Sequence, residues 1–594
     1  MALLHCSSQT KTKMMKVFYH FLLFLALQTS FCFSEDNNDN MTSYIRKKPF
    51  KRKDKKGCRP GENSVEAQFR MQSQHLRSIR GGDTRKCENK KAAGFSCNCI
   101  DLEGFLSLDD LNFAQSANDI WGWTDRETNK EYAIIGLFEG TAFVDISSPN
   151  DPKIAAFMRS AAQGFGNSWR DIKTYKNYAY VVSEANGHGL QIYDMSNLRN
   201  ITGPIMRARP TSRYSSFGSA HNIFINEDSG FAYVVGSNRC RGGLYMLNLS
   251  NPKKPKYAGC FSSDGYTHDV ECVLYDGPDE NYLNREICFA SNEDSLTIID
   301  VTTKDAATQI SKYCHPSFTY THQGWLTNDR KVFILDDELD NTGGTKTFII
   351  DVSTLSQPNM IKTHVSPLKA TDHNQYILNG YSYQANYRAG LRIMDLVNVA
   401  SGDIAEVAYF DVYQADNQFG FNGAWSVFPY FDSGLVVVSG IEQGLFVLRP
   451  TALADDESEL YIANLTASFA NDTLTESSAF DFLTMKVVVS IHDETDSPIE
   501  NVQVNGSFNL INRSSCTTDT TGTCVLKGDI LNRGPRTVTF DINEITLPKY
   551  RYNSSKNKVE ATIKLTKPND DLTTSQGRIF LKNYMKKKRS SDLE

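Results

Sequence analysis

The fold of this chain is decided by a pair of segments, Tyr178-Ala179-Tyr180-Val181-Val182-Ser183 and, after Gly189, Leu190-Gln191-Ile192-Tyr193-Asp194-Met195-Ser196. Aromatic and β-branched residues dominate both segments, which favours β-strands. The glycine between them predicts a tight turn, so that the two strands pair as neighbours. The unit therefore predicts an antiparallel β-structure without a helical period.

The same order of segments recurs along the chain, giving seven copies spaced about 50 residues apart. The strand that ends near an aspartate in each other copy is found at Ala142–Ser147, Leu244–Ser250, Leu296–Val301, Thr347–Val352, Leu391–Leu396 and Leu445–Leu448. Each copy contains four short predicted strands, which is typical of the blade of a β-propeller. We therefore expect an all-β protein with a seven-bladed β-propeller over residues 87–452.

The ends of the repeat region predict how the ring closes. The seventh copy ends at Leu445–Pro450 without a fourth strand, whereas an unassigned strand-like segment, 102–108, precedes the first copy. We expect residues 102–108 to complete the last blade, because this arrangement hides the open sheet edges.

The N-terminal region has the features of a secretory signal. Lys11, Lys13 and Lys16 precede an apolar run from Val17 to Leu27, which is too short to span a bilayer. We expect a signal peptide at 1–34 and no membrane span after its removal; an uncleaved anchor is the alternative. Residues 35–86 are polar and basic, which predicts a disordered leader, with polyanion binding or dibasic processing as the alternative.

A different pattern follows the repeats. We expect a linker at 453–483, a β-sandwich of immunoglobulin-like size at 484–567 and a basic tail at 568–594. The expected strands of the sandwich are Met485–Ile491, Val502–Phe508, Thr523–Leu526, Arg536–Ile542 and Lys558–Leu565.

Cysteines and sequons also indicate the secretory route. Local spacing predicts the disulfides Cys240–Cys260, Cys272–Cys288 and Cys516–Cys524. An odd number of cysteines follows the signal, so one of Cys58, Cys87, Cys97, Cys99 and Cys314 should be free or bridged to another chain. The predicted N-glycosylation sites are Asn40, Asn200, Asn248, Asn464, Asn471, Asn505, Asn512 and Asn553.

The bulk composition excludes some partners. The chain has 594 residues, 22% of them charged, and a formal net charge of −6, which gives no reason to expect nucleic acid as a partner. The expected partners are an extracellular protein, a glycan or a small polar ligand.

Chemistry-bearing side chains recur at one position, the start of the opening strand of each copy. Four copies carry histidine there, and neighbouring positions carry aspartate. The residues of this column singled out for chemistry are His221, His268, His322, His373, Asp119, Asp171 and Asp269. Because opening strands line the channel of a propeller, we expect these side chains to form a polar ring at one mouth.

A second polar column follows the second strand of each copy and includes Glu184 and Glu338. The first and second strands are antiparallel neighbours, so both columns should lie at the same mouth. Imidazoles and carboxylates there predict a site for a divalent cation or another polar ligand. The alternative is a purely structural ring, in which the polar groups connect the blades through hydrogen bonds.

Several stretches of the repeat region resemble the choice-of-anchor B family, which is related to the LVIVD-repeat propellers. The resemblance runs from about Cys87 to Pro450 and is carried by Ala117–Asp125, Trp169–Lys173, Ser183–Gly189, Gly265–Asp269, Thr321–Leu326 and Phe421–Val427. It implies an extracellular or surface propeller whose members differ in their C-terminal attachment. It implies no established activity, and no catalytic residue is transferred from it.

Three functions follow as hypotheses. The first is a secreted binding or adhesion protein with a ligand or cation at the polar mouth. The second is a metal-dependent extracellular hydrolase or lyase that uses the same ring, although no G-x-S-x-G, H-E-x-x-H or P-loop motif is present. The third is a structural component of a surface or matrix.

Overall fold

The chain forms β-strands joined by turns and short 3-10 helices. The computed structural model describes residues 84–566, with gaps at 200, 202, 204, 340–342, 452, 454–457, 470–481, 509–511, 532–536, 547–549 and 553. Within these residues there is no α-helix. The 3-10 helices are η1 (Phe165–Ser168), η2 (Met195–Leu198), η3 (Cys240–Gly242), η4 (Glu280–Tyr282), η5 (Lys304–Ala306), η6 (Val399–Ser401) and η7 (Ser554–Lys556). The prediction of an all-β chain is confirmed.

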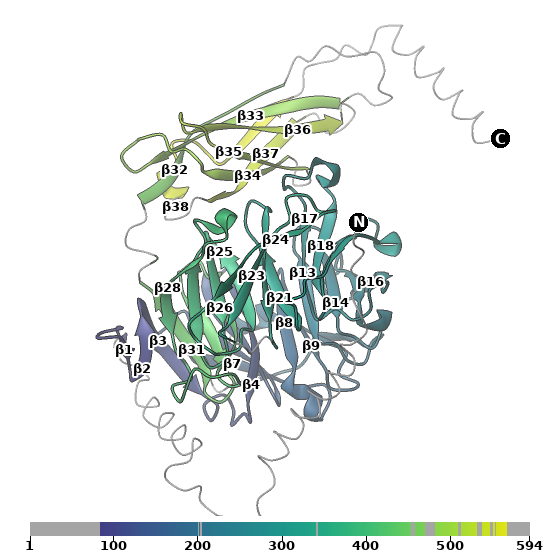
Figure 1. Ribbon diagram of the computed structural model, residues 1–594, viewed down its shortest axis with the longest axis vertical. Coiled ribbons are helices and arrows are strands. Elements are labelled where there is room, and N and C mark those ends of the chain that lie inside the picture. The colour runs from purple at the N-terminus through teal and green to yellow at the C-terminus, as the bar shows by residue number, and fades with distance from the viewer. Residues whose placement is uncertain are drawn as a thin grey trace, which may run out of the picture. The chain divides into compact units, whose positions relative to one another are not determined.

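The chain divides into two compact units, of which the first ends at residue 452 and the second begins at residue 453. The described residues of the first unit form seven sheets, here called sheets 1 to 7 in the order of their opening strands. Four antiparallel strands form the body of each, as the repeated pattern predicts. Figure 1 shows several of these strands side by side, from β4 to β31.

The strands of the first three sheets have the following bounds. Sheet 1 contains β4 (Ala117–Asp125), β5 (Lys130–Leu137), β6 (Gly140–Asp145), β7 (Lys153–Arg159) and, parallel to β7, β11 (Met206–Ala208). Sheet 2 contains β8 (Arg170–Tyr175), β9 (Tyr178–Ser183), β10 (Leu190–Asp194) and β12 (Ser212–Tyr214). Sheet 3 contains β13 (Asn222–Asn226), β14 (Phe231–Val235), β15 (Leu244–Asn248) and β16 (Lys256–Phe261).

The remaining sheets of this unit follow the same plan. Sheet 4 contains β17 (Asp269–Leu274), β18 (Glu286–Ser291), β19 (Leu296–Asp300) and β20 (Thr308–Tyr313). Sheet 5 contains β21 (Thr321–Leu326), β22 (Val332–Asp337), β23 (Lys346–Asp351) and β24 (Asn359–Val365). Sheet 6 contains β25 (Asn374–Leu378), β26 (Tyr381–Ala385), β27 (Leu391–Asp395), β28 (Ala405–Phe410), β2 (Phe95–Asn98) and β1 (Lys91–Ala92). Sheet 7 contains β29 (Ala424–Phe428), β30 (Val436–Gly440), β31 (Gly444–Pro450) and β3 (Ile100–Ser107).

The opening strands of the seven sheets contact one another in a cycle. The contacts run from β4 to β8, β13, β17, β21, β25 and β29, and from β29 back to β4. Residues that begin these strands therefore lie close together although they are far apart in the sequence.

The hydrophobic core of this unit lies between successive sheets. For example, Tyr180 and Val182 of sheet 2 pack with Ile223 and Ala232 of sheet 3 in one buried cluster. Comparable clusters join sheets 1 and 2, 3 and 4, 4 and 5, 5 and 6, and 7 and 1. Burial of these apolar faces stabilises the stack of sheets, at roughly 25 cal/mol for each Å² of apolar surface removed from water.

The strand β3 takes the fourth position in sheet 7, antiparallel to β31. This is the segment that the sequence analysis assigned to that place, and Figure 1 shows β3 beside β31. Leu102 and Leu106 of β3 are fully buried. Gly104 allows the close approach of the strand to sheet 1, since a Cβ atom there would meet the carbonyl oxygen of Pro149 at 2.1 Å.

The second unit contains two four-stranded sheets that share one hydrophobic core. One sheet contains β36 (Thr523–Leu531), β33 (Phe482–Asp493), β32 (Ser458–Phe469) and β38 (Tyr550–Tyr552), and the other contains β35 (Asn512–Thr517), β34 (Gln503–Phe508), β37 (Thr537–Thr546) and β39 (Thr562–Thr566). Val487 and Val489 of the first sheet and Val504 and Phe540 of the second are among the buried residues of this core.

The structure differs from the sequence analysis at the expected linker, 453–483. Residues 458–469 of that segment form the strand β32, which pairs with β33 from Leu460 to Phe469. The register shifts between Ile462 and Asn464, so the buried positions change phase from Leu460 and Ile462 to Leu465. This change of phase removes the simple alternation by which a strand is identified in a sequence.

All three disulfides predicted from local spacing are present, Cys240–Cys260, Cys272–Cys288 and Cys516–Cys524. A fourth bridge joins Cys87 and Cys97. Cys314 is also disulfide-bonded, and Cys99 is free. Cys272 and Cys288 are directly opposite each other on β17 and β18, so their bridge fixes the register of this pair.

Several predictions fall outside the described residues: the signal peptide at 1–34, the basic tail at 568–594, and the sequons at Asn40, Asn200, Asn471 and Asn553. Of the leader at 35–86 only the last three residues are described, and Arg85 there forms a bridge with Leu102. Glycosylation remains a prediction at the other sequons: Asn248 at the end of β15, Asn464 in β32, Asn505 in β34 and Asn512 in β35. Among the described residues, no helix has the length and apolar character needed to cross a membrane.

Candidate functional site

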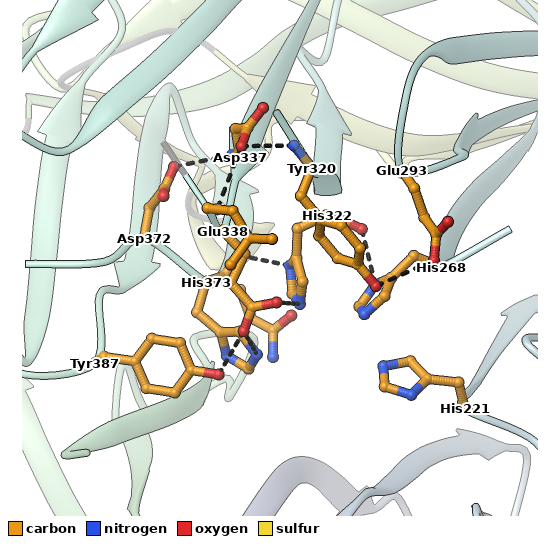
Figure 2. A network of polar contacts seen from close by, with 12 residues as sticks. His221, His268, Glu293, Tyr320, His322, Asp337, Glu338, Asp372, His373 and Tyr387 are labelled. Carbon is orange, nitrogen blue, oxygen red and sulfur yellow. Dashed lines mark hydrogen bonds and ion pairs between the residues drawn. The ribbon is translucent and has the colours of Figure 1, made fainter. Parts of the chain in front are cut away.

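Four histidines lie at the beginning of four successive opening strands. His221, His268 and His373 directly precede β13, β17 and β25, and His322 is the second residue of β21. Their imidazole rings form a continuous row, with centroid separations of 4.1 Å from His221 to His268, 4.1 Å from His268 to His322 and 4.4 Å from His322 to His373. Figure 2 shows these rings together with the carboxylates around them.

The four imidazoles line one small pocket. The predicted aspartates Asp119, Asp171 and Asp269 line it as well. Its other lining residues are Trp169, Arg170, Asn222, Asn374, Tyr376 and Trp425. The structure therefore brings together every histidine and aspartate of the column that the sequence analysis singled out.

Backbone carbonyl groups determine the tautomer of three of these histidines. Nδ1 of His268 is 3.0 Å from the carbonyl oxygen of His322, and Nδ1 of His322 is 3.2 Å from that of His373. His373 makes the same contact with the carbonyl oxygen of Trp425. A carbonyl oxygen only accepts hydrogen bonds, so each Nδ1 must carry the hydrogen. In the neutral ring, Nε2 is then left with a free lone pair.

Burial keeps the same three histidines uncharged. It lowers the pKa of His268 and of His322 well below the ordinary value, and the neighbouring imidazoles act in the same direction. The pKa of His373 falls to about 3, again chiefly because of burial. At neutral pH these rings are therefore neutral, which is the form of imidazole that binds a metal ion.

His221 differs from the other three histidines because a carboxylate is its partner. Its Nδ1 lies 2.7 Å from Oε1 of Glu184. Burial lowers the pKa of His221, but the hydrogen bond and the charge of Glu184 outweigh burial, so its pKa is raised overall. Glu184, a predicted member of the ring, is thus paired with His221, the only one of these four histidines whose surroundings favour the protonated form.

Glu338 follows β22 and lies against two of the neutral imidazoles. Its Oε2 is 3.9 Å from Nε2 of His322, and its Oε1 is 3.8 Å from Nε2 of His373. The hydroxyl of Tyr387 donates to Oε1 at 2.7 Å and orients the carboxyl group. Burial raises the pKa of Glu338 to about 7, against the smaller opposing effect of this hydrogen bond.

Three of the predicted residues offer ligand atoms to a common point. One such atom from each of His268, His322 and Glu338 lies within 4.8 Å of the other two. His268 and His322 are only 3% and 2% exposed, so these ligand atoms are shielded from solvent. Two imidazoles and a carboxylate form a donor set that suits a transition-metal ion.

Two aspartates of the predicted metal set have other partners. The backbone amide of Ile172 donates to Oδ2 of Asp119 at 2.9 Å, and that of Ile223 donates to Oδ2 of Asp171 at 2.7 Å. Asp171 also accepts a hydrogen bond from the buried amine of Lys173 at 2.7 Å. Each aspartate therefore connects its sheet to the next one through a hydrogen bond. The reason is that the opening strands approach closely enough for a carboxylate to reach the amide of its neighbour.

Asp269 lines the pocket without joining the three-residue cluster. Its Oδ1 accepts a hydrogen bond from the amide of Val270 at 2.7 Å, and burial raises its pKa to about 7.

The sequence analysis missed the tyrosines that surround the cluster. Tyr387 contacts Glu338, while Tyr320 donates to Glu293 at 3.3 Å and its ring lies 5.5 Å from that of His268. One signal was available, since the order Tyr-Thr-His occurs at both Tyr266–His268 and Tyr320–His322. No comparable repeat marks Tyr387.

Comparison with known proteins identifies one repeat. The family model of the LVIVD repeat matches residues 166–202, which include β8, β9 and β10. The match and the repeated four-stranded sheets support a β-propeller built from repeats. No curated protein matches the sequence.

Solved structures similar to this chain have low sequence identity to it. The β-propeller domain of Cps50 (Swd1) from Myceliophteria thermophila is 10% identical, with 57% of this chain and 96% of that chain covered and a TM-score of 0.38. A protein from Lactobacillus plantarum is 11% identical, with 66% and 95% covered and a TM-score of 0.37. A functionally unknown protein from Desulfotomaculum acetoxidans is 11% identical, with 49% and 89% covered and a TM-score of 0.34.

Proposed function

We propose that this protein is a secreted, binding-type propeller of seven blades that holds a polar ligand or a cation at one mouth of its channel. The seven sheets and the cycle of contacts between their opening strands support the number of blades. The resemblance of residues 87–450 to the choice-of-anchor B family supports an extracellular or surface location, and so do the disulfides, which persist in oxidising compartments.

The observation that carries the proposal is the common tautomer of His268, His322 and His373. Backbone carbonyl groups engage each Nδ1, so the Nε2 atoms of three neutral imidazoles that line one pocket are left as acceptors. A pocket lined by neutral imidazoles whose Nε2 atoms can accept suits a cation or a polar ligand.

The second unit fits an accessory role. Its two sheets and their shared core support a small immunoglobulin-like β-sandwich, with the Cys516–Cys524 bridge joining two strands. We infer that this unit attaches or spaces the propeller, and that the partner is an extracellular protein, a glycan or a small polar ligand.

A second candidate function is that of a metal-dependent extracellular hydrolase or lyase. One observation favours it, the 2.7 Å contact between the Tyr387 hydroxyl and Glu338, because a phenol beside a metal-binding carboxylate provides a group for proton transfer. Turnover of a polysaccharide by the wild-type protein, lost in Tyr387→Phe, would distinguish this function from binding alone.

The binding proposal is tested by asking what the folded protein carries. Full-length protein secreted from eukaryotic cells is denatured in acid, and the released metal ions and small molecules are measured by elemental analysis and mass spectrometry. We expect one ion or compound per chain from the wild type and much less from His322→Ala. Equal contents in the two proteins would contradict the proposal and favour a structural role for the histidine row.

A further inference from the structure

We propose that His268, His322 and Glu338 bind one divalent transition-metal ion of the zinc class through the two Nε2 atoms and the carboxylate. This inference rests on the proposed function, since it names a ligand of the same row of histidines. It goes further because it assigns the site to three of the nine candidate metal ligands from the sequence. It also assigns the class of ion.

The donor atoms determine the class of ion. Imidazole nitrogen suits Zn²⁺, Cu²⁺, Ni²⁺ and Co²⁺, whereas Ca²⁺ and Mg²⁺ prefer sites built only from oxygen. His268 and His322 are almost completely buried, so water competes poorly for the ion. The oxygen atoms of Asp119 and Asp171 would have suited calcium, but they accept hydrogen bonds from backbone amides.

The contacts around the three ligands resemble the outer shell of a histidine metal site. A metal-binding histidine usually donates its other ring nitrogen to a carbonyl or carboxylate group, which fixes the ring and its tautomer. His268 donates in this way to the carbonyl oxygen of His322, and His322 donates to that of His373. Tyr387 supplies the corresponding hydrogen bond to Glu338. Each proposed ligand thus has one oriented partner and one side left for the ion.

The distances allow one ion to reach all three ligands. Because the ligand atoms lie within 4.8 Å of one another, their common centre is at most about 2.8 Å from each atom. Bonds from zinc to nitrogen or oxygen are about 2.0–2.2 Å long, so each side chain must move inward by roughly 0.7 Å. Small rotations of the side chains supply such a movement.

The neighbouring histidines are not members of this set. Nε2 of His373 is nearest to the other oxygen of Glu338, at 3.8 Å. His221 is held by Glu184 through Nδ1. Three protein ligands leave a fourth position of a tetrahedral ion for water or for a ligand from outside, as in zinc sites that bind substrates.

The test uses full-length protein dialysed against a chelator and then titrated with ZnCl₂ by calorimetry, with CaCl₂ in a parallel titration. We expect one zinc ion per chain and no calcium binding at this stoichiometry. His322→Ala and Glu338→Gln should each weaken zinc binding by about 100-fold or more, since removal of a direct ligand exceeds the 10–100-fold cost of losing an outer partner. The matched control is His364→Ala, which removes a histidine of the same sheet, on β24, and should bind zinc as the wild type does.

Glu338→Gln keeps an acceptor for Tyr387 and serves as the conservative variant, and circular dichroism establishes that each variant is folded. An anomalous difference peak in zinc-soaked crystals, bonded to His268, His322 and Glu338, would support the assignment. Zinc binding that persists unchanged in folded His322→Ala and Glu338→Gln would overturn it, as would a folded wild type that binds no zinc. If zinc fails to bind but acid extraction releases another stoichiometric compound, the metal assignment is wrong and the binding function stands. If neither is found, both are wrong.

Discussion

The backbone amide of Ile223, on the opening strand of sheet 3, donates a 2.7 Å hydrogen bond to Asp171 on the opening strand of sheet 2. The amide of Ile172 makes the same contact with Asp119 on the strand before it, and the amide of Gln375 makes it with Gln323 on β21. One position of the column thus connects consecutive sheets, while the preceding position carries the histidines. The polar ring has two separate roles, and they belong to adjacent residues.

The first prediction concerns Asp171. Asp171→Ala removes the acceptor for Ile223 and leaves the buried amine of Lys173 without its nearest carboxylate. We expect the free energy of unfolding to fall by about 3–5 kcal/mol, because an uncompensated buried charge is costly. Urea titration followed by tryptophan fluorescence measures this change in the first unit, since all five tryptophans, the first at 121 and the last at 425, belong to it.

The control for Asp171 is an exposed ion pair. Asp403 contacts Lys362 with side chains 62% and 50% exposed. Asp403→Ala should leave the free energy of unfolding nearly unchanged, as expected for a solvated pair. Equal effects of the two substitutions would show that Asp171 does not connect the sheets.

The second prediction concerns the strand β3 that completes sheet 7. Leu106 is fully buried in the cluster shared by sheets 1 and 7. Leu106→Ala should lower the free energy of unfolding by about 2–5 kcal/mol, because it leaves a cavity in the core. Phe113→Ala, a larger truncation at a side chain that is 81% exposed, should have an effect within about 0.5 kcal/mol. A small effect at Leu106, measured by the same urea titration, would mean that β3 is not needed for a stable first unit.

The strands of the propeller could be predicted from the sequence because they repeat. The segments Tyr178–Ser183 and Leu190–Ser196 correspond to β9 and β10, and each further copy of the pattern strengthened the prediction. The strand β32 is not part of a repeat, and its change of phase at Ile462 obscured its alternation. The repeated segments therefore predicted strands more reliably than the alternation of apolar and polar residues within a single segment.

The site was predicted as a ring of side chains but not as a set of contacts. A column of histidines is visible in a sequence, because spacing alone defines it. The separation of Asp119 and Asp171 from the histidines is not visible, since it depends on which backbone amides lie within reach of a carboxylate. The contact of Tyr387 with Glu338 joins residues 49 positions apart, so only the arrangement of sheets 5 and 6 reveals it.

The third prediction concerns pH and Glu271, a residue of β17 outside the histidine cluster. Burial raises the pKa of Glu271 to about 8 from its ordinary 4.5, against the smaller opposing effects of Arg330 and of the amide of Leu326. The folded protein therefore holds a proton that the unfolded chain releases above about pH 4.5. This difference should reduce stability progressively between about pH 4.5 and 8.

Glu271→Gln removes the ionisation and keeps an oxygen that accepts the hydrogen bond from Leu326. We expect the free energy of unfolding of the wild type, measured relative to Glu271→Gln, to fall by on the order of 3–5 kcal/mol from pH 4.5 to 8. Parallel profiles of the two proteins across this range of pH would contradict the prediction.

The fourth prediction concerns the cross-strand disulfide of sheet 4. The bridge between Cys272 and Cys288 closes a loop with a sequence separation of 16 residues. The double variant Cys272→Ala and Cys288→Ala should lose about 3 kcal/mol of unfolding free energy, because the unfolded chain gains freedom. Cys99→Ser alters the free cysteine and should have little effect under the same conditions. A stable double variant would show that strand pairing alone maintains this register.

The pairing of β3 with β31 also determines when the protein can finish folding. During synthesis β3 leaves the ribosome early, but its partner is made about 340 residues later, which is a very non-local pairing for a single sheet. Until translation reaches residue 450, the edge of β3 that pairs with β31 has no native partner and can pair wrongly with other chains. Molecular chaperones should therefore matter most for this segment, and a truncated product that ends before β31 should misfold or be degraded.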